Sequence, residues 1–248
     1  TKNLPDVAVT PSEHFNTVVY SGTGSNGNAV TVGFNPSFTW IKSRSGGRDN
    51  ILVDQVRGNT KLLSSNTTGA EETGTTDFQS FDSNGFTVGT PSTTGGTNTS
   101  GESIVSWNWK ANGSGSSNTN GSITSTVSAN VDAGFSIVSY TGNGSSSATI
   151  GHGLSKAPEM VIVKSRDLAS TNWLTAINVT GSYIDLNLND TSANSNAGDG
   201  DYFAQAFTST TFKPNVNGSN PTNGNGNTYI SYCFHSVDGY SKVGSYTG

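Results

Sequence analysis

Two lysine–arginine pairs are the charged residues best placed to bind a partner. Lys42 and Arg44, and likewise Lys164 and Arg166, are separated by one serine and end a run of mainly apolar residues. In an extended strand the two cations of each pair share one face. Two interpretations remain open. The cations contact an acidic neighbour or a glycan, or they project out of the core at the end of the strand and pair with nearby carboxylates.

One tryptophan in a less regular stretch is the candidate ligand-facing aromatic residue. Trp173 follows Asn172 and aligns with Ile51 of an earlier, similar stretch of the chain. The other tryptophans align with bulky residues, which is typical of core positions: Trp40 with Ile162, Trp107 with Tyr232, and Trp109 with Phe234. Trp173 and Asn172 are therefore the predicted ligand-binding residues of this region.

Metal chemistry has little support. Asp199-Gly-Asp201 resembles a fragment of a calcium loop, but Ca²⁺ takes about 6–8 oxygen ligands in a defined geometry. Asp199 and Asp201 are thus weak calcium candidates, and the alternative is a pair of solvated loop carboxylates. One cysteine and three scattered histidines cannot build a Cys/His zinc site. We expect no cofactor.

Catalytic motifs lack their structural context. Gly22-Thr-Gly24-Ser-Asn-Gly27 matches the glycine pattern of dinucleotide-binding loops, which requires a helix directly after it. Residues 28–34 instead have the alternation of a strand, so we interpret the motif as a glycine turn. Glu71-Glu72, the only adjacent acidic pair, lies in a Thr/Gly-rich loop, and no Gly-x-Ser-x-Gly elbow is present. The sequence predicts a protein that is not an enzyme.

The elements that position these residues follow from composition. The chain has 248 residues, of which 31 are glycine, 31% are hydrophobic and only 12% are charged, with a net charge of −5. Ser, Thr and Asn supply most of the rest, and they favour turns and strand surfaces over helices. The acidic balance argues against nucleic-acid binding, no apolar run is long enough to span a membrane, and residues 1–10 lack a signal-peptide profile.

The chain also repeats itself, with each landmark recurring about 120–126 residues later. Phe15–Gly24 recurs as Phe135–Gly144, Pro36–Arg44 as Pro158–Arg166, Leu63–Asn66 as Leu186–Asn189, Phe81–Phe86 as Phe207–Phe212, and Ser103–Trp109 as Thr228–Phe234. We predict an all-β protein of two tandem antiparallel β-sandwich repeats, jelly-roll or lectin-like. The expected division is an arm (1–13), repeat 1 (14–111), a Gly/Ser/Asn-rich linker (112–133), repeat 2 (134–239), and the start of a third repeat or a pairing strand (240–248). Within the linker, residues 112–122 are expected to be flexible and residues 124–128 are a candidate short strand.

These motifs resemble a known domain. The patterns at Phe15–Gly24, Pro36–Arg44 and Ser80–Phe86 are similar to the repeated domain of uncharacterised marine phage proteins, from cyanophages and ocean podoviruses, that are described as virion or tail-fibre components. The second copy carries the first two patterns but departs from the third at Ala206–Phe212. The resemblance implies a phage structural context and carries over no catalytic residue.

We therefore expect a non-enzymatic virion structural protein (a tail fibre, knob or capsid decoration) on the particle surface that contributes to host attachment. Its expected partners are other virion subunits, including copies of itself, and host-surface glycans. The alternative is a secreted or displayed lectin-like module that reads glycans through Trp173 or the turns at Gly22 and Gly142. A third hypothesis, an all-β glycan hydrolase, requires two inward-facing carboxylates in one groove.

Overall fold

The computed structural model describes residues 9–93, 95–179, 182–191, 195–196, 207–216 and 221–244. Apart from one turn of 3₁₀ helix, Pro11–Glu13, the regular structure in these residues is β-strand, and every pair of named strands is antiparallel. The prediction of an all-β protein is confirmed. No helix in the described part of the chain is long and apolar enough to cross a membrane.

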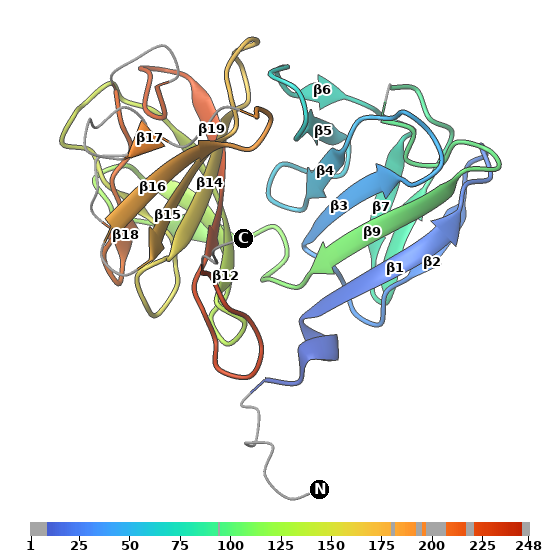
Figure 1. The fold of residues 1–248 in the computed structure, drawn as a ribbon, viewed down its shortest axis with the longest axis horizontal. Helices are drawn as coiled ribbons and strands as arrows, with labels where there is room; N and C mark the ends of the chain where they lie inside the picture. The colour runs from blue at the N-terminus through green and yellow to red at the C-terminus, as the bar shows by residue number, and fades with distance from the viewer. Residues whose placement is uncertain are drawn as a thin grey trace, which may run out of the picture.

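The strands form two bodies that lie side by side (Figure 1). In the N-terminal half, a six-stranded sheet has the order β1-β9-β3-β4-β5-β6 and a three-stranded sheet has the order β2-β8-β7. Their bounds are β1 Phe15–Ser21, β2 Asn28–Thr31, β3 Phe38–Ser43, β4 Ile51–Asp54, β5 Lys61–Ser64, β6 Glu72–Thr73, β7 Phe78–Asp82, β8 Gly85–Val88 and β9 Ser103–Trp109. Buried Val30, Ile41, Phe78, Phe86 and Ile104 belong to the core of this half.

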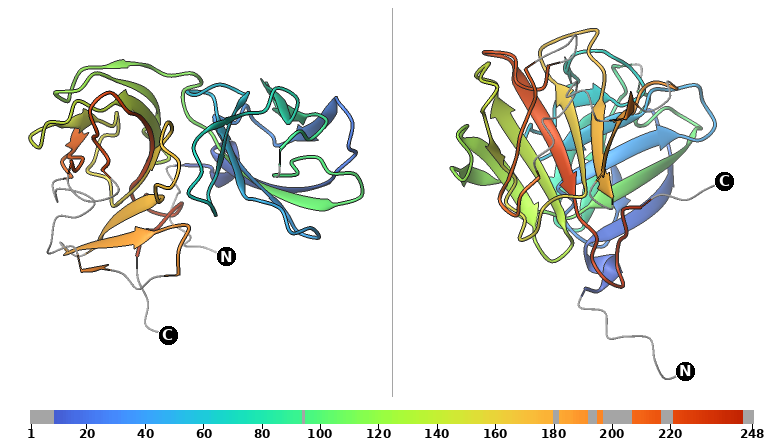
Figure 2. Two further views of the ribbon diagram at one scale, coloured as in Figure 1. Left: turned by 90° about the horizontal axis from the view of Figure 1, so that it is seen from above. Right: turned by 60° about the vertical axis from the view of Figure 1, so that its left-hand side comes forward.

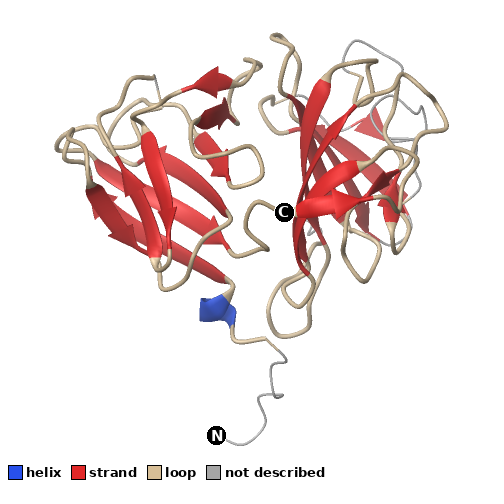
Figure 3. Ribbon diagram, turned by 180° about the vertical axis from the view of Figure 1, so that it is seen from behind, coloured by secondary structure: helices blue, strands red, loops and turns tan. Residues whose placement is uncertain are grey.

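In the C-terminal half, an eight-stranded sheet has the order β10-β11-β12-β19-β14-β15-β16-β17, beside a two-stranded sheet of β13 and β18. The bounds are β10 Ser116–Asn118, β11 Ser125–Asn130, β12 Phe135–Thr141, β13 Ile150–Gly151, β14 Met160–Ser165, β15 Leu174–Val179, β16 Ser182–Asn187, β17 Ser195–Asn196, β18 Thr211–Phe212 and β19 Thr228–Phe234. Val138, Tyr140, Val161, Phe212 and Tyr229 belong to its core. Figure 3 shows that both bodies consist of strands and loops, apart from the short helical turn before β1, drawn in blue.

The same pairings occur in both halves. The sheet order β1-β9-β3-β4-β5 is matched by β12-β19-β14-β15-β16, and Phe15 opposite Trp109 is matched by Phe135 opposite Phe234. Local hydrogen bonds agree as well: the Tyr20 hydroxyl donates to Thr97 O (2.6 Å) and the Tyr140 hydroxyl to Thr222 O (2.7 Å).

This equivalence corrects one sequence alignment. The Asn50 backbone N–H donates to Asn66 Oδ1, and the Trp173 backbone N–H donates to Asn189 Oδ1 in the same way. Trp173 therefore occupies the position of Asn50 and not of Ile51. The strand pairing sets this register, and a one-residue shift moves a side chain to the opposite face of the sheet.

The segment 112–133, expected to be a linker that is flexible over residues 112–122, carries β10 and β11, which extend the sheet beyond β12. The physical reason is burial: Ile123 and Val127 are in the core of the C-terminal half. The alternation in residues 124–128 was the signal for this strand.

The glycine motif after β1 forms a turn, as interpreted. Gly24 and Gly27 have φ values of 71° and 84°, a region that glycine enters without steric cost. The strand β2, not a helix, begins at Asn28. In the segment expected to start a third repeat (240–248), Ser241 forms an antiparallel bridge to Val237, and residues 245–248 lie outside the described part of the chain.

Candidate functional site

The most distinctive site is the contact between the two halves. Alternate residues of a strand point to opposite faces, and the outward faces of the two large sheets carry apolar side chains here. We call this cluster the interface core; its buried members are Phe38, Leu52, Leu63, Phe135, Ile137, Ile162, Trp173, Ile230 and Tyr232. It joins strands that lie on either side of the gap between the bodies in Figure 2.

Aromatic rings from both halves stack in the interface core. The Phe38 ring lies parallel to that of Tyr232, with centroids 4.4 Å apart, and also stacks on Trp109 at 5.0 Å. Phe135 and Phe234 pack at 5.0 Å. Such pairs contribute about 0.5–1.5 kcal/mol each beyond the apolar area they bury.

Trp173 lies inside this core and not on the surface. Its side chain is fully buried, and its indole N–H donates to the Ser64 carbonyl of the opposite half at 2.9 Å. The ring thus offers no face to an external ligand in this structure. Asn172, half-buried beside it, accepts a hydrogen bond from the Asn189 amide at 3.0 Å.

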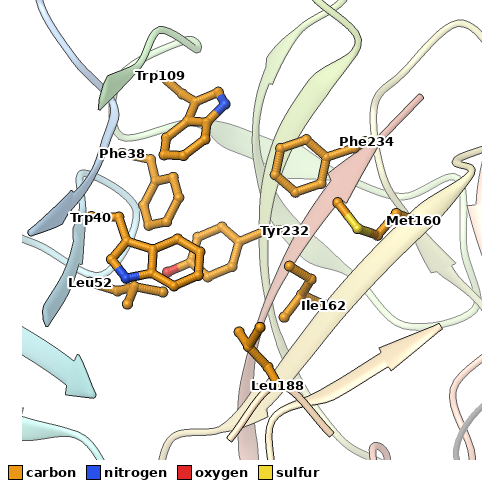
Figure 4. A pocket seen from close by; sticks show the side chains of 9 residues that line it. All are labelled: Phe38, Trp40, Leu52, Trp109, Met160, Ile162, Leu188, Tyr232 and Phe234. Carbon is orange, nitrogen blue, oxygen red and sulfur yellow. The ribbon is translucent and has the colours of Figure 1, made fainter. Parts of the chain in front are cut away.

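An apolar pocket of about 150 Å³ opens between the halves (Figure 4). All nine lining side chains are apolar or aromatic: Phe38, Trp40, Leu52, Trp109, Met160, Ile162, Leu188, Tyr232 and Phe234. The one hydroxyl among them, that of Tyr232, donates to Asp54. The pocket therefore suits an apolar group better than a sugar, which requires converging polar atoms.

Charged residues are buried next to the apolar part of the interface. Arg57 and Asp54, both fully buried at their side chains, form an ion pair of 2.6 Å. The Arg57 guanidinium also donates to Leu52 O (2.9 Å) and Lys61 O (3.1 Å), and the Tyr232 hydroxyl donates to Asp54 Oδ2 (2.8 Å). Burial is the largest single influence and lowers the pKa of Arg57, but the charges of Asp54, Tyr232 and Glu71 and the hydrogen bond to Asp54 together outweigh it, so the net pKa is raised.

Glu71 extends this network across the interface. It pairs with Arg57 at 3.2 Å within its own half and accepts two hydrogen bonds of 2.8 Å from Arg166 of the opposite half. The Glu71 backbone N–H also donates to Arg166 O. Burial raises the pKa of Glu71, but the hydrogen bond from Arg166 and the charge of Arg57 lower it more, so its net pKa lies below the usual value.

The two lysine–arginine pairs have different surroundings. Lys164 is fully buried and donates to Thr171 O (2.9 Å), Thr171 Oγ1 (2.8 Å) and Thr68 O (3.2 Å), the last of these in the other half. Burial lowers the pKa of Lys164 to about 8. Lys42 is half-buried and donates to Arg48 O, whereas Arg44 is exposed, with a 3.4 Å contact to Ser103 Oγ.

Of the predicted site residues, the interface brings together Trp173, Lys164 and Arg166, with Asn172 beside them. Lys42 and Arg44 lie apart from this group and bond within the N-terminal half. Arg166 pairs with the Glu71 carboxylate. This agrees with the second interpretation of the lysine–arginine pairs, in which a cation at the strand end pairs with a carboxylate. Asp199 and Asp201 lie outside the described residues, and the described residues hold no group of three or more His, Cys, Asp or Glu side chains arranged for a metal ion.

Sequence reasoning did not select Asp54 and Arg57. The pattern that could have indicated them is a pair of opposite charges, three residues apart, directly after the apolar run Ile51–Val53. Charged residues at the end of such a run are usually interpreted as exposed to solvent. Glu71 was considered only as half of a carboxylate pair. In the structure it holds two arginines, so the chemistry of this cluster is the electrostatic joining of the halves.

Comparison with known families gives one match. A family model described as "Domain of unknown function (DUF7483)" matches residues 10–248. The chain belongs to this family. The DUF7483 match runs through both halves without a break, so the interface core lies within one family domain. No curated protein and no solved structure matches the chain.

Proposed function

We propose that this DUF7483 chain is a non-enzymatic structural module of a virion, as part of a tail fibre, knob or capsid decoration on the particle surface. In this proposal two β-sandwiches of tandem origin act as one rigid body that binds other virion subunits, including further copies of itself. The observation that carries the proposal is the interface core with its buried ion network, because it fixes one half against the other.

The tandem origin is supported by bonds that recur at equivalent positions. Asn98 Nδ2 donates to Ser25 O (2.8 Å), and Asn223 Nδ2 donates to Ser145 O (2.9 Å), so each asparagine fastens the glycine turn of its own half. Gly22 N–H donates to Glu102 O as Gly142 N–H does to Asn227 O. Matching pairing, register and side-chain bonds favour duplication of one sandwich over two unrelated folds.

Rigidity and surface chemistry support the structural role. A large apolar contact between halves suppresses the relative motion that domains otherwise show. The remaining surface is rich in Ser, Thr, Asn and Gly, with 12% charged residues in the chain. A stiff, weakly charged β-module suits a particle surface that must persist outside a cell.

The decisive experiment is mass spectrometry on purified virions of a phage that encodes this chain, with immunogold labelling to locate it. We expect the chain in stoichiometric amounts on the particle. Its absence from intact particles, with the chain abundant in infected cells, would refute the proposal.

A lectin-like module remains the second candidate, because two half-buried tryptophans lie beside the interface core on the face of the N-terminal sheet that carries Phe38. Trp40 and Trp107 lie opposite each other on β3 and β9, with ring centroids 6.3 Å apart, and Lys42 follows on the same face. Aromatic faces beside polar groups are a common basis for sugar binding. Its ligands would be host-surface glycans.

A glycan array separates the two candidates. Binding that Trp107→Ala abolishes and Trp173→Phe leaves unchanged would support the lectin, since Trp107 is partly exposed to solvent whereas Trp173 is fully buried. No binding above background would exclude it and leave the structural role.

A further inference from the structure

The strand β11 shows how a sheet edge is completed in the C-terminal half. It pairs antiparallel with β12, with Val127 opposite Val138 and Ser128 opposite Ile137. Val127 is buried in the core of that half. A Cβ atom at Gly153 would lie only 2.6 Å from Val127, so glycine at this position makes room for the strand.

At the equivalent edge, that of β1, the described residues of the N-terminal half place no further strand. The Gly22 N–H donates to Glu102 O at the end of the β1–β9 ladder, so alternate residues Tyr20 and Val18 bond to β9. The backbone groups of Thr17 and Val19 therefore point away from β9, and they have no hydrogen-bond partner among the described residues.

The side chains beneath this edge are incompletely covered. Val18 and Tyr20 are half-buried, whereas their equivalents Val138 and Tyr140 are buried. Around Gly33, the equivalent of Gly153, a Cβ atom would meet nothing within 4 Å. Among the described residues, no side chain of the N-terminal half therefore fills the space that Val127 fills in the C-terminal half.

We propose that β1 is a docking edge for an extended strand of the β11 type, donated by a neighbouring polypeptide. The donated strand runs antiparallel to β1, opposite residues 15–20, bonds to the backbone of Thr17 and Val19, and places a β-branched side chain beside Gly33. This inference rests on strand geometry and does not depend on the virion role.

The edge has the properties of a site for strand addition. Charged residues and prolines usually protect a free edge strand from pairing with another strand. The sequence of β1 contains neither, and Val19 is 55% exposed. A second copy would instead bring its own β1, in which Tyr20 is held to Thr97 of the same half. That strand has no free side chain to place beside Gly33, so a separate donor strand fits better.

The test uses a fluorescent peptide of residues 122–131, which contains β11, as the donor. We expect saturable binding to the full chain by fluorescence anisotropy, with slowed hydrogen exchange at the Thr17 and Val19 amides. A peptide with Val127→Asp is the matched control, and its binding should be weaker by roughly tenfold or more because it places a charge in an apolar space.

Two protein variants locate the site. Val19→Pro removes an outward N–H without touching the β1–β9 ladder and should abolish peptide binding, whereas Val19→Thr should preserve it. If Val19→Pro fails to fold, cross-linking decides: Thr17→Cys should form a disulfide with a Ser128→Cys peptide and not with a Thr126→Cys peptide. The native Cys233 is buried and does not interfere.

Each contrary outcome overturns the proposal. No binding of the peptide to the folded wild-type chain excludes a β11-type donor. Binding that Val19→Pro leaves unchanged places the peptide elsewhere, for example by displacement of the native β11. A wild-type dimer that Val19→Pro converts to a monomer, without peptide binding to either form, assigns the edge to a second copy of the chain.

Discussion

Replacing Arg57 with methionine tests the buried ion network most sharply. The substitution keeps a long apolar stem but removes the guanidinium that pairs with Asp54 at 2.6 Å and with Glu71 at 3.2 Å. Glu71 keeps its two hydrogen bonds from Arg166. Asp54 keeps only the Tyr232 hydroxyl and the backbone N–H of residue 57. A fully buried carboxylate thus loses its counter-charge.

The expected cost follows from that unpaired charge. Removing one partner of a buried ion pair destabilises a protein by about 3–5 kcal/mol, and in a chain of this size this lowers the melting temperature by about 6–20 °C. The double variant Asp54→Asn, Arg57→Met has a neutral amide in the same place and should recover most of the loss.

Urea unfolding followed by tryptophan fluorescence, with thermal melts alongside, gives the measurement. The matched control is Arg48→Met, which breaks a 3.0 Å ion pair with Glu102 in which the arginine side chain is 39% exposed; such pairs contribute about 1 kcal/mol or less. An Arg57→Met loss no larger than that of Arg48→Met, or a double variant no more stable than the single one, would refute the reasoning.

Three further predictions concern single residues of the interface. Trp173→Phe removes the 2.9 Å indole donor of the Ser64 carbonyl, which keeps the longer bonds from the Thr67 N–H (3.3 Å) and hydroxyl (3.4 Å), and should cost about 0.5–1.5 kcal/mol in urea unfolding; an unchanged midpoint would contradict the bond. Because the pKa of Glu71 is lower in the folded state, its contribution is present above its ordinary pKa and is lost as the pH falls through the folded value, so Glu71→Gln should flatten the acid limb of stability below pH 4.5, the ordinary pKa of a glutamate; an acid limb identical to wild type would count against this. The pKa of Lys164 is lowered to about 8 from 10.5, so the unfolded chain binds more protons between these values and stability should gain a rising component with pH there. Lys164→Met should remove that component, and equal slopes in the two proteins would show that the lysine titrates normally.

Composition and alternation predicted the all-β class and the strands of the repeated segments, but not β10 in the segment expected to be a flexible linker. The run from Phe15 to Tyr20 and its counterpart from Phe135 to Tyr140 are strands at the expected places, because period-two patterns and glycine turns are local properties of the sequence. The repeat also aligned most of the equivalent strands. It missed the register at Trp173, since only strand pairing sets which residue lies opposite another.

The interface could not be predicted in the same way. Alternation shows that Trp40 and Ile162 share a face with other bulky residues, but it does not say which body covers that face. They were interpreted as core positions, and they lie instead at the contact between the halves. Lys164 was interpreted as a strand-end cation for the same reason: its burial comes partly from Thr68 of the other half, about a hundred residues away in the sequence.

Differential scanning calorimetry of the full chain tests the central claim, that the two halves form one rigid unit, most directly. The interface core and the Glu71–Arg166 pair predict a single transition in which the calorimetric and van't Hoff enthalpies agree. Arg166→Met combined with Phe38→Ala, which weakens the contact from both sides, should split that transition into two. Two well-separated transitions in the wild-type chain would contradict the account.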